Sequence, residues 1–311
     1  MKIRAFQQID VFGSAPYLGN PLAVVLDGTD LTTDEMQHFA QWTNLSETTF
    51  LLPPSTQGAS AGADYRLRIF TPGAELPFAG HPTLGSCHAW LNAGGKPNAE
   101  EIVQECQAGL IRIRRTGTRL AFAAPPLRRS TPALELLARI SAALGLKPQQ
   151  IKAAQLLDNG PVWLALLLDS RHTVLALTPD HAALKQSGQK VGVAAIEVAT
   201  GTTRLIARSN REARAFVPAQ TQAATAADDS VEVEVRAFAA PVGVQEDPVT
   251  GSLNASLAQW LIADGMTPGA YIASQGTCVG RAGQVHITQD ETGQVWVGGD
   301  SVKCIEGSVN L

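Results

Sequence analysis

Two corners of the chain place a glycine and a polar residue at the start of an apolar, helix-like stretch. One corner ends in Gly80 and His81, and the other ends in Gly251 and Ser252. The first turn of a helix has unpaired N–H groups and a partial positive charge, and glycine lets a ligand approach its backbone closely. If both turns face one cleft, they can hold a small anionic substrate. The plainer interpretation, that both glycines only make tight turns, stays open.

The two corners belong to a longer internal repeat. Residues 68–91 and 236–261 both read Arg-x-Phe, Pro, Gly, Glu-x-Pro-x-x-Gly, a polar residue and a helix ending in Trp-Leu, although the spacing slips before Glu246. Agreement in this order favours duplication over two unrelated strand–turn–helix corners. It predicts two domains of like architecture, which we place at 1–125 and 126–311. The stretch near 302–311 is a candidate strand that crosses back to the first domain.

The elements that must position these corners are mostly strands. Strand patterns bounded by Gly, Pro, Asp or Asn cover residues 4–11, 23–26, 48–52, 65–70, 110–114, 162–168, 231–238, 285–288 and 294–297. Helical patterns cover 32–42, 83–91, 133–144 and 254–262. Strands outnumber helices, so the sequence predicts an α+β fold rather than a doubly wound dinucleotide fold. We interpret the proline-rich residues 124–132 as a linker and residues 219–230 as a surface loop.

Composition excludes several classes of function. Of the 311 residues, 45% are hydrophobic and 17% are charged, which is typical of a compact protein with large cores. The net charge of −4 offers no basic face for nucleic acid. The N-terminus has a strand pattern rather than a signal core, and the longest apolar stretch is too short to cross a bilayer. We therefore expect a soluble, cytoplasmic protein with no membrane partner.

The cysteines and histidines do not indicate a metal. The four cysteines and six histidines are dispersed, without a Cys-x-x-Cys motif or a His-x-x-x-His ligand pair. Reduced thiols, some of them buried as small hydrophobic groups, are the plainer interpretation, and Cys87 is expected in the core.

Four motifs stand in order along the whole chain: residues 19–25 (GNPLAVV), 44–50 (NLSETTF), 78–83 (FAGHPT) and 246–252 (EDPVTGS). Together they resemble the PhzF-like family of phenazine-biosynthesis isomerases, which shares its fold with diaminopimelate epimerase. The resemblance implies two pseudo-symmetric domains, each a curved, mostly antiparallel β-sheet around a central helix, with the active site between them. It also implies that no cofactor is needed and that the protein is commonly a homodimer.

The resemblance also assigns roles to residues. It implies isomerisation like that of trans-2,3-dihydro-3-hydroxyanthranilate, in which a proton moves between ring carbons. Glu47 matches the family's proton-transferring glutamate, and His81, Asp247 and Ser252 match its substrate contacts. The backbone amides at Gly80 and Gly251 would receive substrate oxygens.

A carboxyl shuttle fits these residues better than a pair of thiols. Diaminopimelate epimerase uses two cysteines at the equivalent helix starts, and neither corner of this chain has one. Burial raises the pKa of a glutamate, and the apolar residues that follow Glu47 are compatible with such a setting.

Plainer roles and other functions stay open. Glu47 alone would be interpreted as a solvated or capping residue, and Asp247 before Pro248 as a helix N-cap. Glu75 and Glu246 are expected to be structural, and Asn20 to brace a turn beside the cleft. An epimerase or racemase acting on another small acid, and a non-catalytic binding protein, are the alternatives to the isomerase. The substrate is not identifiable from the sequence.

Overall fold

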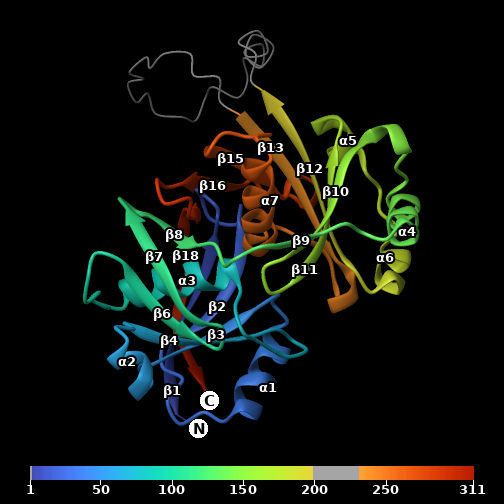
Figure 1. Ribbon diagram of the computed structural model, residues 1–311. Helices are drawn as coiled ribbons and strands as arrows, with labels where there is room; N and C mark the ends of the chain where they lie inside the picture. The colour runs from blue at the N-terminus through green and yellow to red at the C-terminus, as the bar shows by residue number, and fades with distance from the viewer. Residues whose placement is uncertain (1, 199–230) are drawn as a thin grey trace, which may run out of the picture.

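The computed structural model describes residues 2–198 and 231–311, and its elements form two halves stacked one above the other in Figure 1. The predicted loop at residues 219–230 lies outside the described residues. The first half comprises, in order, β1 (Ile3–Val11), β2 (Asn20–Val25), α1 (Thr33–Thr43), β3 (Thr48–Leu52), α2 (Thr56–Ser60), β4 (Tyr65–Phe70), β5 (Glu75–Leu76), α3 (Gly80–Asn92), β6 (Ile102–Cys106), β7 (Gly109–Thr116) and β8 (Arg119–Ala123).

The second half repeats this succession with a few additions. Its elements are β9 (Arg128–Ser130), α4 (Leu134–Leu144), β10 (Ile151–Asp158), β11 (Val162–Leu168), α5 (Arg171–Ala176), α6 (His181–Ser187), β12 (Lys190–Val198), β13 (Val231–Ala239), β14 (Val244–Asp247), α7 (Gly251–Ala263), β15 (Ala270–Gln275), β16 (Gly283–Gln289), β17 (Val295–Gly299) and β18 (Ser301–Asn310).

Strand pairing is the same in both halves. Strand β2 pairs antiparallel with β1 and parallel with β3, β4 pairs antiparallel with β3 and parallel with β6, and β7 pairs antiparallel with β6 and β8. Strands β10 to β17 repeat these pairings, with β10 in the place of β1 and β17 in the place of β8. The α+β class is confirmed, and the pairing agrees with a duplicated unit.

The repeat also holds for side chains. Arg68 donates twice to Glu75 (2.7 Å each), and Arg236 donates twice to Glu246 (3.0 and 2.8 Å). Each guanidinium lies 5.1 Å from the ring centroid of the phenylalanine two residues later in its strand. Both glutamates are therefore structural, as predicted, and hold β5 and β14 against the strands before them.

Two strand pairings join the halves. Strand β8 pairs with β17, and β18 returns from the second half to pair with β1, while β9 pairs with β10 within the second half. The proline-rich junction is thus more than a linker, because it contains β9. Both chain ends lie at the same end of the molecule in Figure 1, beside β1. The domain boundary at residue 125 stays a prediction.

Helices α3 and α7 are the centres of the two halves. Leu84, Cys87 and Ala89 of α3 are fully buried, as are Leu253 and Leu261 of α7. A helix that is apolar on all sides is stable only where neighbouring elements surround it. One hydrophobic cluster contains residues of both helices and of the surrounding strands. The predicted central helices are confirmed, with earlier starts than the sequence pattern indicates.

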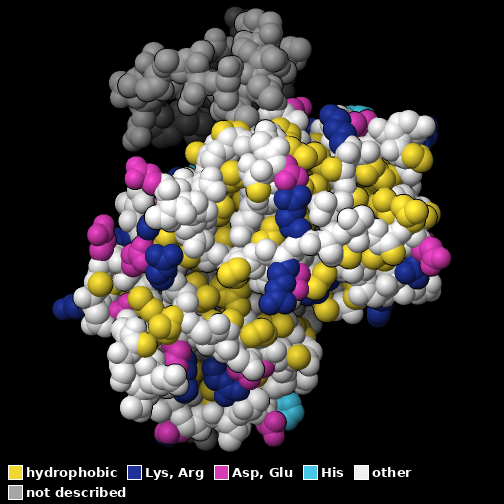
Figure 2. All heavy atoms as spheres, viewed as in Figure 1, with side chains coloured by type: hydrophobic (Ala, Val, Ile, Leu, Met, Phe, Trp, Pro, Cys, Tyr) yellow, Lys and Arg dark blue, Asp and Glu magenta, His cyan; other side chains and the backbone are white. Residues whose placement is uncertain are grey.

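Several smaller predictions have clear outcomes. The helix predicted from Thr32 is α1, where Thr32 and Glu35 form a capping box. Helices α5 and α6 and strands β9 and β10 are not predicted, because they are short or lack regular alternation. In the described part of the chain, no helix combines the length and apolarity needed to cross a membrane. On the face shown in Figure 2, basic and acidic side chains are interspersed.

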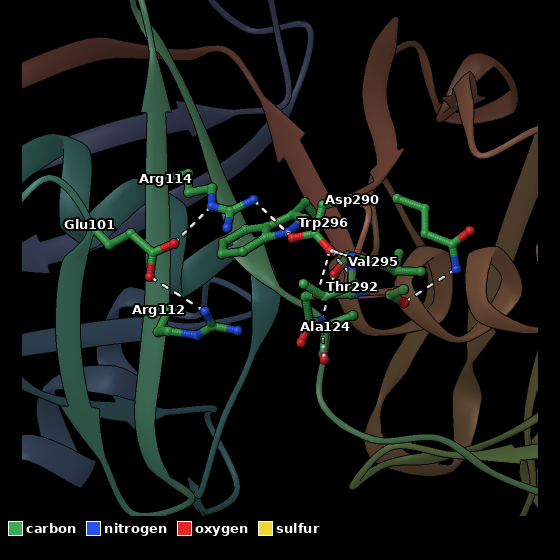
Figure 3. Close-up of polar contacts among 11 residues, drawn as sticks. Glu101, Arg112, Arg114, Ala124, Asp290, Thr292, Val295 and Trp296 are labelled. Atoms are coloured by element: carbon green, nitrogen blue, oxygen red, sulfur yellow. Dashed lines mark hydrogen bonds and ion pairs between the residues drawn. The ribbon is translucent and has the colours of Figure 1, made fainter.

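A polar cluster fastens β7 to the turn between β16 and β17 (Figure 3). Arg114 donates to Glu101 (2.8 Å) and to Asp290 (3.0 Å), and its guanidinium lies 3.7 Å from the ring centroid of Trp296. Trp296 Nε1 donates to the same Asp290 (2.9 Å). These contacts support the β8–β17 pairing, where the two halves join.

Candidate active site

The N-termini of α3 and α7 meet at Gly80 and Gly251. A Cβ at residue 80 would lie 2.9 Å from Gly251 Cα, and a Cβ at residue 251 would lie 2.9 Å from Gly80 Cα. Neither approach is sterically acceptable, so the contact requires glycine on both sides. The two corners singled out in the sequence are therefore adjacent in the structure.

Neither of these helix starts is capped by a side chain. The N-cap residues Ala79 and Thr250 make no side-chain hydrogen bond to the first turn within the described part of the chain. Two partial positive charges, each from an uncapped helix dipole, consequently lie next to each other. This arrangement favours an anionic group close to both turns.

Glu47 reaches this point from the turn between α1 and β3. Asn44 ends α1 in the left-handed conformation (φ 54°), and the following turn places Glu47 directly before β3. Its Oε2 lies 3.3 Å from His81 Nε2, and the two side chains are 16% and 5% exposed. The structure thus brings Glu47 and the start of α3 together.

Asn20 connects the two halves at the site. Its Nδ2 donates to Asp247 Oδ1 (2.9 Å) and to the carbonyl of Val249 (2.9 Å), and lies 3.4 Å from His81 Nδ1. Asn20 is 1% exposed and begins β2. It therefore does more than brace a turn, because it fixes Asp247 and His81 relative to each other.

The interpretation of Asp247 as a helix N-cap is wrong. Asp247 ends β14, and α7 begins only at Gly251, with Thr250 as its N-cap. Pairing of β14 with β13 keeps Asp247 in an extended conformation, so its carboxylate cannot reach the first helical turn. That carboxylate instead accepts hydrogen bonds from Asn20 and from the hydroxyl of Thr250.

Burial shifts the ionisation of all three central groups. Burial raises the pKa of Glu47 to about 7, against smaller opposing effects of Ser46 and Lys190. Burial, followed by the charge of Glu47, raises the pKa of Asp247 to about 6. Burial lowers the pKa of His81 to about 4, although Asp247 and Asp10 favour its charged form. Near neutral pH the imidazole is uncharged and Glu47 is close to half ionised.

The surroundings of His81 select one tautomer. Nδ1 faces Nδ2 of Asn20, an amide nitrogen that cannot accept a hydrogen bond and that donates its two hydrogens to Asp247 and Val249. The proton of the neutral imidazole is therefore placed on Nε2, which faces Glu47 Oε2. In this form His81 can donate to an ionised Glu47 and hold its carboxylate in position.

Ser252 is held from the second half. Its hydroxyl accepts from Trp163 Nε1 (3.2 Å), and its carbonyl accepts from Asn159 Nδ2 (2.9 Å). Several buried polar atoms around this point have no hydrogen-bond partner among the described residues, namely Asn20 Oδ1, Ser46 Oγ, Glu47 Oε2, His81 Nε2 and Asn159 Oδ1. Such atoms are costly to leave unpaired, and together they could receive the polar groups of a ligand.

Cys87 does not take part in this cluster. It is fully buried in α3, and burial raises its pKa to about 12. A thiol with this pKa is protonated at neutral pH and is a poor base. The prediction that Cys87 lies in the core is confirmed, and a thiol at this position offers no route to two-thiol chemistry.

Sequence reasoning missed three residues near the site. Asn159 lies in the turn between β10 and β11, Trp163 lies in β11, and Lys190 begins β12. The charge of Lys190 lowers the pKa of Glu47. The charges of Glu47 and Asp247 in turn raise the pKa of Lys190. No sequence motif surrounds Lys190, and only the pairing of β12 with β11 and β13 shows where it lies.

The comparisons with known proteins agree over the whole chain. A family model described as "Phenazine biosynthesis-like protein" matches residues 9–307. Antisense-enhancing sequence 1 of Schizosaccharomyces pombe is 33% identical over 99% of this chain and 99% of that protein. Trans-2,3-dihydro-3-hydroxyanthranilate isomerase of Pseudomonas aeruginosa is 38% identical, but the match spans only 57% of this chain and 61% of that enzyme.

Solved structures show the same fold at lower identity. A phenazine biosynthesis protein of the PhzF family from Bacillus anthracis matches with a TM-score of 0.76 and 21% identity, covering 100% of both chains. A probable proline racemase from Agrobacterium radiobacter matches with a TM-score of 0.60 and 14% identity, covering 100% of this chain and 93% of the other. At these identities the structures establish the fold alone, and they agree with the predicted epimerase-like architecture.

Proposed function

The chain belongs to the phenazine biosynthesis-like protein family, and from that premise we propose that it is an isomerase which moves a proton on a small carboxylate-bearing substrate. Relatives named trans-2,3-dihydro-3-hydroxyanthranilate isomerase support this reaction type. In this proposal Glu47 carries the proton, and the paired starts of α3 and α7 bind the substrate's oxygens.

The observation that carries the proposal is the position of Glu47. A carboxyl group with a pKa of about 7 lies 3.3 Å from His81, which in turn occupies the first turn of α3. A base whose pKa is near the working pH is half available as an acceptor and half available as a donor. The same group can therefore take a proton from one carbon and return it to another.

The proposed step is balanced without a redox partner. The Glu47 carboxylate removes a proton from a C–H bond next to an unsaturated system, and the electron pair left behind delocalises toward the substrate's acid group. The amides at Gly80 and Gly251 stabilise the negative charge that develops on oxygen. Glu47, now protonated, returns the proton to a different carbon, and the double bonds shift accordingly.

The other residues have positioning roles in this proposal. His81 Nε2, 3.3 Å from Glu47 Oε2, would donate to the ionised carboxylate and keep it oriented, while Asn20 and Asp247 fix the imidazole from the other side. Ser252 and the unpaired oxygen of Asn159 supply contacts from the second half. Holding acid and substrate in one geometry would supply a large part of the rate.

Incubation of small unsaturated acids in deuterated water tests the function. The panel includes trans-2,3-dihydro-3-hydroxyanthranilate, and proton nuclear magnetic resonance follows each carbon. An isomerase yields a shifted double bond, and deuterium enters the carbon that receives the proton only to the extent that protonated Glu47 exchanges with solvent before the return step. Catalysis of this kind should be lost when both helix starts are obstructed by Gly80→Ala together with Gly251→Ala.

Other outcomes identify the alternatives. Deuterium entering the original carbon with inversion of configuration would indicate an epimerase or racemase and would contradict the isomerase. Saturable binding of an acid, with no shifted double bond and no deuterium in any member of the panel that binds, would indicate a binding protein of the same fold.

A further inference from the structure

Strand register places Lys190 at the position that Glu47 occupies in the other half. Thr48 of β3 pairs with Phe70 of β4, and Val191 of β12 pairs with Phe238 of β13. Phe70 and Phe238 are equivalent in the repeat, so the residues directly before the two paired positions, Glu47 and Lys190, are equivalent as well.

A second pairing supports the same alignment. Ala23 pairs with Thr48, and Leu164 pairs with Val191, which makes Gly19 and Gly160 equivalent. Both glycines donate their backbone N–H to an aspartate of the preceding strand, Asp10 (2.8 Å) and Asp158 (3.0 Å). The register is therefore the same around both members of the Glu47–Lys190 pair.

Trp163 lies between Lys190 and the start of α7 in a chain of contacts. Its Nζ lies 5.8 Å from the ring centroid of Trp163, and the indole N–H of that residue donates to Ser252 at the start of α7. Burial lowers the pKa of Lys190, while the charges of Glu47 and Asp247 raise it. Its ammonium makes no ion pair or hydrogen bond with any residue that the structure describes.

The ionised side chains of the site favour a cation, in addition to the two helix starts, when an acid binds. Glu47 in its basic form and Asp247 are both negative, and His81 is neutral above about pH 4. A carboxylate entering beside two carboxylates would be repelled, and in a site of low dielectric this repulsion is large. Of the ionisable side chains in this cluster, Lys190 is the one that can offset it.

We propose that Lys190 forms an ion pair with the substrate's carboxylate beside the start of α7, and so makes the site selective for acids over neutral analogues. This inference rests on the proposed function, because it names the group that recognises the substrate of the same site. The pseudo-symmetric site thus has two chemically different ends, a proton carrier in the first half and an anion receptor in the second.

Calorimetric titration with anthranilate and with its neutral amide, anthranilamide, tests this role. The wild-type protein should bind anthranilate more tightly than anthranilamide. Lys190→Met keeps the length of the side chain and should weaken anthranilate binding by about tenfold or more, the size expected for one charged hydrogen bond. Its affinity for anthranilamide should stay within about twofold, and Lys190→Arg should restore the preference for the acid. Lys185→Met, at an exposed lysine of α6, is the matched control.

Three results would overturn the proposal for Lys190. These are unchanged selectivity in Lys190→Met, lack of preference for the acid in the wild type, and binding of neither compound by the wild type. If the wild-type protein still isomerises an acid of the panel when any of these results is obtained, the proposed isomerase stands and only the role of Lys190 is refuted. Conversely, selectivity that depends on Lys190 in a protein that catalyses no isomerisation would support the receptor and refute the isomerase.

Discussion

Glu47 and His81 are in contact, yet between about pH 4 and pH 7 neither of them is mainly charged. Burial is the first cause in both cases, raising the pKa of the acid and lowering that of the imidazole. The pair is therefore an uncharged acid and an uncharged base in close contact in this range rather than a salt bridge. Ionisation of Glu47 near pH 7 converts it to the basic form that the proposed step needs.

The raised pKa of Glu47 predicts a pH-dependent stability. Below about pH 4.5 the carboxyl is protonated in both the folded and the unfolded chain. Between about 4.5 and 7 the unfolded chain ionises first, so the folded chain binds more protons and the free energy of unfolding falls as the pH rises. Glu47→Gln has no carboxyl at this position, so its free energy of unfolding does not fall for this reason. Urea unfolding at pH 5 and pH 8 should show the variant gaining up to about 3 kcal/mol relative to wild type at the higher pH.

Glu100→Gln, at an exposed position, is the control for this comparison. Its stability should follow that of the wild type at both pH values. A gap between Glu47→Gln and wild type that stays constant from pH 5 to pH 8 would refute a raised pKa at Glu47.

At the scale of secondary-structure elements, the site depends on two buried helices that touch at their first residues. Helices α3 and α7 can do so because glycine begins each one, and their N-terminal amides stay uncapped. The glycines let the helix starts touch, and the uncapped amides beside them are free to bind an anion. Packing and binding are therefore coupled at residues 80 and 251.

Substitution of Gly251 separates the two helix starts. A Cβ in Gly251→Ala would lie 2.9 Å from Gly80 Cα, so the helices must move apart, which outweighs the better helix propensity of alanine. We expect a loss of about 1–3 kcal/mol of stability, as for other overpacked cores, and at least tenfold weaker anthranilate binding. Thermal unfolding and calorimetry provide the two measurements.

Gly73→Ala is the matched control, because a Cβ there would meet only Thr71 Oγ1, at 3.8 Å. This variant should unfold and bind as the wild type does. If Gly251→Ala also behaved as wild type, the close approach of α3 and α7 would be incorrect.

At the scale of the whole molecule, the halves exchange strands rather than merely facing each other. Strand β18 leaves the second half and pairs with β1 over residues 3–11, while β8 of the first half pairs with β17 of the second. Asn20 adds a hydrogen-bonded link from the first half to Asp247 at the site itself. The relative position of Glu47 and Lys190 is therefore fixed by the fold as a whole.

Removal of β18 should destabilise both halves. A chain ending at Asp300 loses the backbone hydrogen bonds of β1 on one side. At about 0.5–1.5 kcal/mol for each bond, the loss approaches the whole stability of a typical domain, about 5–15 kcal/mol. We expect circular dichroism to show no cooperative unfolding transition near 37 °C. Glu306→Ala leaves the strand in place and should unfold as wild type, and a truncated chain that did the same would contradict this role of β18.

The sequence predicts the fold and part of the site for identifiable reasons. The repeated Arg-x-Phe and Glu-x-Pro-x-x-Gly pattern predicts both halves, because the Arg68–Glu75 and Arg236–Glu246 pairs require the same strand–turn–helix geometry. Residues fixed by the repeat motif itself, such as Gly80 and Gly251, are visible from the pattern.

Residues brought in by long-range contacts are not visible in this way. Lys190 approaches the site only through the pairing of β12 with β11 and β13, and its surrounding sequence carries no motif. The error over Asp247 has a related cause, because an Asp-Pro pair is typical of a helix start and only the pairing of β14 with β13 shows that the strand continues to Asp247.

The most direct test compares the rate of double-bond isomerisation by wild type and Glu47→Gln at pH 8, on whichever acid of the panel the wild type turns over. Glutamine keeps the size of the side chain but cannot carry a proton, so the isomerisation rate should fall by about 10²–10⁴-fold while anthranilate still binds. Isomerisation at the wild-type rate in Glu47→Gln would show that another group moves the proton, and the central claim would be wrong.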